Sequence, residues 1–233
     1  MSIIIENIKR LQDNIPENVK LIAVSKFKSV SVIKEAYLAG QHAFGENKAQ
    51  EMTDKYQSLP KDIQWHFIGH LQTNKIKYII PYVTMIHSVD SIKLLCEINS
   101  CAEKNNRIVD CLIQFHIATE ESKFGFSFYE AEKMIESNVF QLWRNIRICG
   151  VMGMATFTDD QALIRSEFKT LKAYFLTLKN KYFMDQNSFK EISMGMTDDY
   201  LIAIEEGSTM VRIGSAIFGS RTPNQNIEQN KTH

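Results

Sequence analysis

A lysine closes the first apolar run of the chain, where its amine is suited to imine chemistry. The segment Ala23-Val24-Ser25-Lys26 reads as the end of a β-strand. Burial at such a position disfavours the ammonium form and lowers the pKa, as a Schiff-base lysine requires. Taken alone, the segment is better explained by a lysine that reaches from the rim into water. Lys28, two residues later, is the competing nucleophile.

Two segments near the C-terminus have the composition of an anion site. Ser193, Met194 and Gly195 end one apolar run, and Gly214 and Ser215 end the next. The glycine N–H groups are expected to form an anion-binding nest, to which the serine hydroxyls add donors. No Gly-Lys-Ser/Thr follows the first glycine, so the segment is not a Walker loop.

Two further polar residues lie where apolar runs would position them. Arg212 stands between Val211 and Ile213, and a buried permanent charge needs a partner. That partner is either a carboxylate inside the fold or a ligand acceptor such as a pyridine nitrogen. Asn47 ends the run Phe44-Gly45-Glu46-Asn47, where it either hydrogen-bonds a planar ligand or caps the next helix.

The histidines and cysteines do not predict a metal site. His66 and His70 would face the same side of a strand, but no third ligand accompanies them. We therefore expect them to pack or hydrogen-bond inside the fold. The cysteines form no C-x-x-C pair, which favours free thiols. They are Cys96, Cys101, Cys111 and Cys149.

The elements that must hold these residues are strands alternating with helices. Eight strand-like runs alternate with helical patterns, which predicts a single (β/α)8 barrel of the TIM type with an N-terminal helix. A doubly wound sheet is the alternative. Function collects at the carboxyl ends of barrel strands, and phosphates often bind after the last two. The runs are Leu21 to Lys26, Ala43 to Asn47, Trp65 to His70, Met85 to Asp90, Val109 to Ile117, Ile146 to Met154, Phe189 to Gly195 and Met210 to Phe218.

The clearest helix lies between the sixth and seventh runs. Its apolar residues recur at helical spacing, and Thr158 with Gln161 resembles a capping box before it. Gly40 and Gly207 stand where two other helices are expected to end. The apolar stripe consists of Leu163, Ile164, Phe168, Leu171, Phe175 and Leu178.

Bulk composition excludes several classes of protein. Lys+Arg and Asp+Glu both number 27, so the chain lacks the excess of basic residues that is typical of nucleic-acid binders. No apolar run is long enough for a membrane span, and the N-terminus lacks a signal-peptide pattern. We therefore expect a cytoplasmic protein with one domain over residues 1–221. Residues 222–233 are expected to form a loose tail.

Taken together, the motifs resemble the pyridoxal phosphate homeostasis protein family, whose barrel is similar to the N-terminal domain of alanine racemase. The resemblance covers residues from about 20 to 221. It is carried by Ala-Val-Ser-Lys at 23–26, Phe-Gly-Glu-Asn at 44–47, Trp-His-Phe-Ile-Gly-His-Leu-Gln-Thr-Asn-Lys at 65–75, His-Ser-Val-Asp at 87–90, Ser-Met-Gly-Met-Thr-Asp-Asp at 193–199 and Val-Arg-Ile-Gly-Ser-Ala-Ile-Phe-Gly at 211–219.

The resemblance implies a role for each matched residue. Lys26 would carry pyridoxal 5′-phosphate (PLP) as a Schiff base, Arg212 would face the pyridine nitrogen, and Asn47 would lie near the ring. Ser193, Gly214 and Ser215 would surround the phosphate, with Met194 and Gly195 nearby. Three places depart from the family pattern: Phe27 replaces a small polar residue, His116 replaces a common polar one, and Gly-Val-Met-Gly-Met at 150–154 varies on the usual sixth strand.

Three functions follow from this implied site. An arginine facing the nitrogen cannot accept a proton, so the ring would be a weakened electron sink. Racemases add a second base from a further domain, which this chain does not show after its eighth strand. We therefore expect a monomeric, non-catalytic PLP carrier in vitamin B6 and amino-acid homeostasis, with apo-PLP enzymes as recipients. The alternatives are a PLP-dependent racemase or lyase, and a PLP-free aldolase that uses Lys26.

Overall fold

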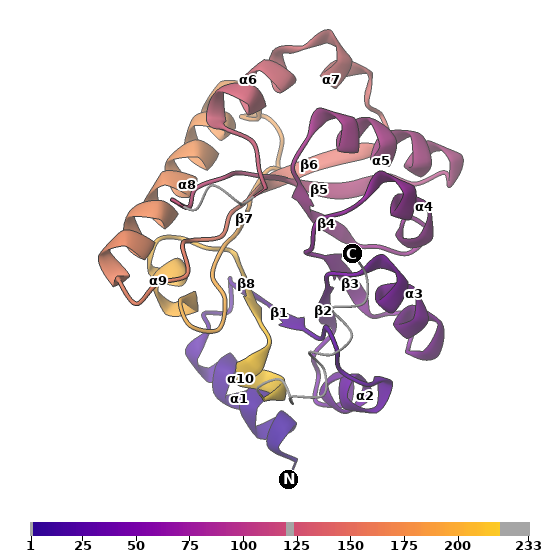
Figure 1. Cartoon of the computed structure of the whole chain (residues 1–233), viewed down its shortest axis with the longest axis vertical. Helices are drawn as coiled ribbons and strands as arrows, with labels where there is room; N and C mark the ends of the chain where they lie inside the picture. Colours follow the sequence, from indigo (N-terminus) through magenta and orange to yellow (C-terminus); the bar gives the residue numbers. More distant parts are fainter. Residues whose placement is uncertain (1, 120–123, 220–233) are drawn as a thin grey trace.

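Eight parallel strands close into a barrel, and helices cover its outside (Figure 1). The computed structural model describes residues 2–119 and 124–219. Strand β8 pairs with β1, with Lys20 opposite Met210 and Ala23 opposite Ile213. This closure confirms the predicted barrel and excludes a doubly wound sheet, which would leave two edge strands unpaired. The strands are β1 (Lys20–Val24), β2 (Ala43–Glu46), β3 (Gln64–Phe67), β4 (Met85–Val89), β5 (Val109–Gln114), β6 (Ile146–Met152), β7 (Glu191–Ser193) and β8 (Met210–Ile213).

Helices fill the connections between the strands. The expected N-terminal helix, α1, begins after Ser2, whose Oγ accepts a hydrogen bond from the N–H of Ile4. Among the described residues, no helix is both long and apolar enough to cross a bilayer. The helices are α1 (Ile3–Asn14), α2 (Val30–Leu38), α3 (Ala49–Ser58), the 3-10 turn η1 (Thr73–Lys75), α4 (Ile76–Ile79), α5 (Ile92–Lys104), α6 (Phe128–Glu136), α7 (Asn138–Leu142), α8 (Gln161–Tyr182), α9 (Tyr200–Glu205) and α10 (Ser215–Phe218).

Helix α8 confirms the apolar stripe but corrects the residue that caps it. All of the stripe except Leu163 is buried. The N-cap is Asp160, whose carboxylate accepts hydrogen bonds from the N–H groups of Ala162 and Leu163 at 2.9 and 3.1 Å. Thr158 instead accepts from the N–H of Asp160. The predicted capping box was wrong because a nearer carboxylate satisfies the first free N–H groups.

The last strand is shorter than predicted. Strand β8 ends at Ile213, and residues 215–218 form the short helix α10 instead of continuing the strand. The N–H groups of Ile217 and Phe218 turn back onto the carbonyl of Gly214. Ile217 is fully buried, and its carbonyl accepts from the Asn7 side chain of α1. Packing against α1 therefore overrides the strand propensity of Ile217 and Phe218.

Candidate functional site

A cavity of about 460 Å³ opens at the carboxyl ends of the strands, and we call it the mouth cavity. It gathers five of the eight predicted site residues from β1, β2 and β8. These are Lys26, Asn47, Arg212, Gly214 and Ser215. Lys26 is half-buried there, directly after the end of β1. The barrel therefore brings an amine, an amide and a guanidinium group to one opening, as barrel topology predicts.

A buried cluster of charges holds the chain on both sides of Lys26. We call Glu46, Glu51 and Lys55 the carboxylate network. Glu46 accepts a hydrogen bond from the Ser25 hydroxyl at 2.6 Å, and Glu51 accepts one from the Phe27 N–H at 2.6 Å. The network therefore contacts both sequence neighbours of Lys26 and fixes the backbone from which its side chain leaves.

Lys55 links the two carboxylates of the network. Its Nζ donates to Glu46 at 2.7 Å, to Glu51 at 2.6 Å and to the carbonyl of Ser25 at 2.8 Å. The side chains of Lys55 and Glu46 are 6% and 0% exposed. Burial raises the pKa of Glu46 to about 7, although the charge of Lys55 opposes that rise. Sequence reasoning did not find this network, because its members are spread over β2 and α3.

Phe27 occupies a backbone conformation that is unusual for a large side chain. Its φ is +64°, in the left-handed region that residues other than glycine and asparagine rarely adopt. The hydrogen bond to Glu51 holds it there. Such strain persists only where the surrounding structure imposes it, and it is common at functional sites. Phe27, where the sequence predicts an unusual residue, is thus the strained neighbour of Lys26.

Asn47 meets the cavity with an unsatisfied polar atom. Its Oδ1 is buried and has no hydrogen-bond partner among the described residues. The alternative prediction, that Asn47 caps the next helix, was wrong: Lys48 is the N-cap residue of α3, and no side chain makes the capping bond. Buried polar atoms are rarely left unpaired in folded proteins. A donor on a bound ligand would satisfy this one.

Arg212 is buried, and among the described residues it has no carboxylate at ion-pair distance. Its side chain donates to Ser193 Oγ at 2.6 Å and to the carbonyl of Gly153 at 3.1 Å, and the residue is 3% exposed. Burial lowers its pKa to about 10, while the more distant charge of Asp199 opposes that shift. Within the described residues, no carboxylate lies at ion-pair distance, so the structure does not support an interior salt bridge. The guanidinium stays charged at neutral pH, and its described acceptors are both neutral.

Ser193 belongs to a polar chain inside the barrel, not to the lining of the cavity. Its Oγ lies 2.8 Å from His87 Nδ1, and His87 Nε2 lies 2.8 Å from His66 Nδ1. Burial lowers the pKa of His66 to about 3 and that of His87 well below its usual value. Both rings are therefore neutral at pH 7. His66 hydrogen-bonds inside the fold as predicted, and Ser193 orients Arg212.

The predicted anion-binding segments are used unequally. Gly214 and Ser215 line the cavity, and Thr197, which was not predicted, bonds to the Ser215 hydroxyl at 3.1 Å. Met194 is fully buried, and Gly195 makes a turn at φ +92° in which a Cβ would lie 2.6 Å from Ala203. Neither of these two lines the cavity. The part of the predicted anion site that lines the mouth is therefore the start of α10 beside Thr197.

His70 lies beyond β3 at the mouth, apart from His66. Its Nδ1 lies 2.8 Å from the carboxylate of Asp90, and its ring stacks on Phe124 at 4.1 Å. Both His70 and Phe124 line the mouth cavity. The strand-based expectation placed both histidines inside the fold and was wrong for His70, because β3 ends at Phe67. Among the described residues, no group of three potential ligands surrounds either histidine.

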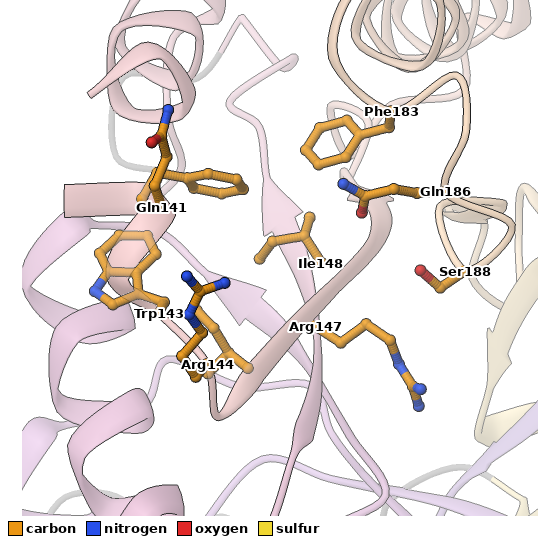
Figure 2. A pocket seen from close by; sticks show the side chains of 10 residues that line it. Gln141, Trp143, Arg144, Arg147, Ile148, Phe183, Gln186 and Ser188 are labelled. Carbon is orange, nitrogen blue, oxygen red and sulfur yellow. The ribbon is translucent and has the colours of Figure 1, made fainter. Parts of the chain in front are cut away.

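A second cavity, of about 510 Å³, lies at the amino ends of β6 and β7 (Figure 2). Trp143, Arg144 and Phe183 line it, and the described lining residues include no lysine. Arg147 extends away from Phe183 in Figure 2 and bonds Asp110 at 2.7 Å. This cavity is at the end of the barrel opposite the predicted site and contains none of its residues. We refer to it as the lower cavity.

Comparisons with known proteins show the family to which the chain belongs. The family model for "Alanine racemase, N-terminal domain" matches residues 1–222. A pyridoxal phosphate homeostasis protein of Aquifex aeolicus is 39% identical over 204 residues, covering 87% of this chain and 87% of that protein. One of Haemophilus influenzae is 38% identical over 217 residues, covering 91% and 89%.

Solved structures show the same barrel. PipY of Synechococcus elongatus PCC7942, solved with PLP bound, has a TM-score of 0.82 and 32% identity, covering 93% of this chain and 100% of that one. Alanine racemase of E. faecalis has a TM-score of 0.71 at 16% identity and covers 96% of this chain and 59% of that one, which shows the fold alone. The chain therefore belongs to the pyridoxal phosphate homeostasis protein family, built on the barrel of the alanine racemase N-terminal domain.

Proposed function

We propose that this protein holds PLP reversibly on Lys26 in the mouth cavity and serves PLP and amino-acid homeostasis without turning over a substrate. One observation carries the proposal: the cavity joins a half-buried amine, an amide oxygen and an arginine, and among the described residues the oxygen has no hydrogen-bond partner and the arginine no carboxylate partner. PLP presents a carbonyl, a polar ring and a phosphate, which complement these groups. When bound, PLP supplies reversible imine formation and an aromatic ring that withdraws electrons.

Each residue at the mouth has a separate task toward the cofactor. Lys26 supplies the amine, from a backbone fixed by the carboxylate network. Arg212 offers only donors and a permanent charge, so it binds the ring nitrogen or an anion without taking a proton. Gly214, Ser215 and Thr197 contribute hydroxyl and backbone donors for the phosphate. Ser193 acts through Arg212.

Lys28 also lines the mouth cavity, and burial lowers its pKa. Its Nζ donates to the carbonyl of Phe218 at 3.1 Å. Breaking that bond to attack a carbonyl would leave the acceptor unpaired. Lys28 therefore fastens the end of α10 over the mouth.

The test is a titration of the unloaded protein with PLP, followed by borohydride reduction. An absorbance band near the imine region, roughly 420 nm, should appear in the wild type. Lys26→Ala should lose the band and the reduced adduct, whereas Lys28→Ala should keep both. A reduced adduct that survives in Lys26→Ala would show that another lysine is the anchor.

The carrier role has its own test. Loaded protein should pass PLP to an apo-enzyme, and it should not racemise amino acids. Turnover on the order of 1 per second would instead identify an enzyme. A monomeric, cytoplasmic carrier with apo-enzymes as recipients is the form of the function that we propose.

A further inference from the structure

One histidine that lines the mouth cavity, His70, is paired with a carboxylate and is not among the PLP-binding residues proposed above. Asp90 holds Nδ1 of His70 at 2.8 Å. The Asp90 side chain is 7% exposed, and that of His70 is 45% exposed. A carboxylate accepts only, so Nδ1 carries the proton and Nε2 is left as the basic atom. This is the arrangement by which a buried carboxylate orients a histidine base.

The pair stands near Lys26 but on another strand. Lys26 follows β1 and His70 follows β3, with β2 between them in the barrel. Both side chains line the same cavity. Stacking on Phe124 at 4.1 Å and 19° fixes the plane of the His70 ring. An exposed ring that is held by two contacts at the edge of a cavity is placed to meet a molecule that enters it.

We propose that His70 is the base that hands PLP from Lys26 to an incoming primary amine. This proposal rests on the proposed function, because it requires PLP on Lys26. A primary alkyl amine arrives mostly as the ammonium ion, since such groups have a pKa of about 10. An ammonium ion has no lone pair with which to attack the imine carbon.

The transfer is balanced in atoms and electrons. The imine starts protonated on Nζ. His70 Nε2 takes one proton from the ammonium, the freed lone pair bonds to the imine carbon, and the π pair of the imine moves to Nζ. A second proton then moves within the adduct from the incoming nitrogen to Nζ. The bond from the carbon to Nζ breaks with its electron pair on Nζ, while the lone pair of the incoming nitrogen forms the new imine. His70 returns its proton to the freed Nζ. The products are PLP joined to the ligand amine as a protonated imine and Lys26 as an ammonium ion, with no oxidant or reductant required.

The test compares two amines that differ in protonation. Loaded protein is mixed at neutral pH with ethylamine, which is protonated, or methoxyamine, which is not, and loss of the Lys26 imine band is timed. His70→Gln should slow the reaction with ethylamine about 100-fold, as expected for loss of a general base, and leave the reaction with methoxyamine unchanged. Asp90→Asn should slow ethylamine in the same selective way.

The control is a second histidine–aspartate pair outside the mouth. His42 Nδ1 lies 3.8 Å from Asp62, and neither residue lines the cavity. His42→Gln should leave both rates unchanged. Equal slowing of both amines in His70→Gln, or an unchanged ethylamine rate, would overturn the role of His70.

A measurement on the unloaded protein supplies a further check. ¹⁵N NMR should show the neutral His70 ring protonated at Nδ1, and Asp90→Asn should lower the population of that tautomer. An Nε2-protonated ring in the wild type would contradict the proposal. Failure of the wild type to form an imine band would refute the proposed function itself, which separates the two outcomes.

Discussion

Two buried cations support the mouth, and the protein compensates them in opposite ways. Lys55 donates to two carboxylates and a carbonyl. Arg212 donates to a serine hydroxyl and a carbonyl, with no carboxylate at ion-pair distance in the described part of the chain. Both residues are nearly inaccessible to water, at 5% and 3% exposure. The barrel thus neutralises the charge of Lys55 with carboxylates, whereas no described carboxylate pairs with Arg212.

The difference separates a structural task from a binding task. Lys55 lies behind the backbone of Ser25 and Phe27 and does not line the cavity, so its charge has to be matched within the fold. Arg212 lines the cavity, where a ligand can supply the missing partner. The lower cavity offers a contrast, because Arg147 there already bonds Asp110 and its side chain is 52% exposed.

Removing Lys55, the cation that is paired with carboxylates, should have the largest effect on the free energy of unfolding. Lys55→Met leaves the carboxylates of Glu46 and Glu51 without their partner. At pH 8 we expect a loss of about 3–5 kcal/mol in the free energy of unfolding, measured by urea denaturation. Lys34→Met, on the exposed face of α2, is the control and should change it by less than about 0.5 kcal/mol. A small loss in Lys55→Met would show that the network is dispensable.

The pH dependence of the free energy of unfolding should reflect the titration of Glu46. Its pKa is about 7 in the folded protein and 4.5 ordinarily, so the folded state binds more protons than the unfolded state between these values. The contribution of Glu46 to the free energy of unfolding is complete below pH 4.5 and is lost as the pH rises through 7. Its size is at most about 3 kcal/mol.

Glu46→Gln is the variant that isolates this contribution. The slope of unfolding free energy against pH between 4.5 and 7 should become flatter than in the wild type. Glu103→Gln, at an exposed position of α5, should keep the wild-type slope. An identical slope in Glu46→Gln and wild type would assign the pH dependence to other groups.

Removing Arg212 should lower the free energy of unfolding least and the affinity for PLP most. Arg212→Met leaves no charge unpaired, but Ser193 Oγ and the Gly153 carbonyl each lose a donor, which costs about 1–2 kcal/mol. The affinity for PLP should fall at least tenfold in an absorbance titration. Arg147→Met should leave PLP affinity unchanged. A stability loss as large as that of Lys55→Met would remove the distinction between the two cations.

The strands and helices were predicted more completely than the contacts between side chains. All eight strands were found, because apolar runs and intervening helical stripes are local patterns. Element ends were less predictable: β8 gave way to α10, and Asp160 replaced the expected cap. At the site, Lys26 was located by its position at the end of a strand and Arg212 by its position between apolar strand residues. The carboxylate network was not, because it joins β1, β2 and α3 through side chains.

By itself, the sequence determined the barrel, the lysine at the end of β1 and the arginine within β8, since these depend on the order and periodicity of strands. Only the tertiary structure decided that Ser193 faces the interior, that Lys55 bonds two carboxylates and that His70 pairs with Asp90. Ser193 lies 106 residues from His87 along the chain, and His70 lies 20 from Asp90. Such pairs form because the closed barrel sets the register and facing of its strands, which no local pattern encodes.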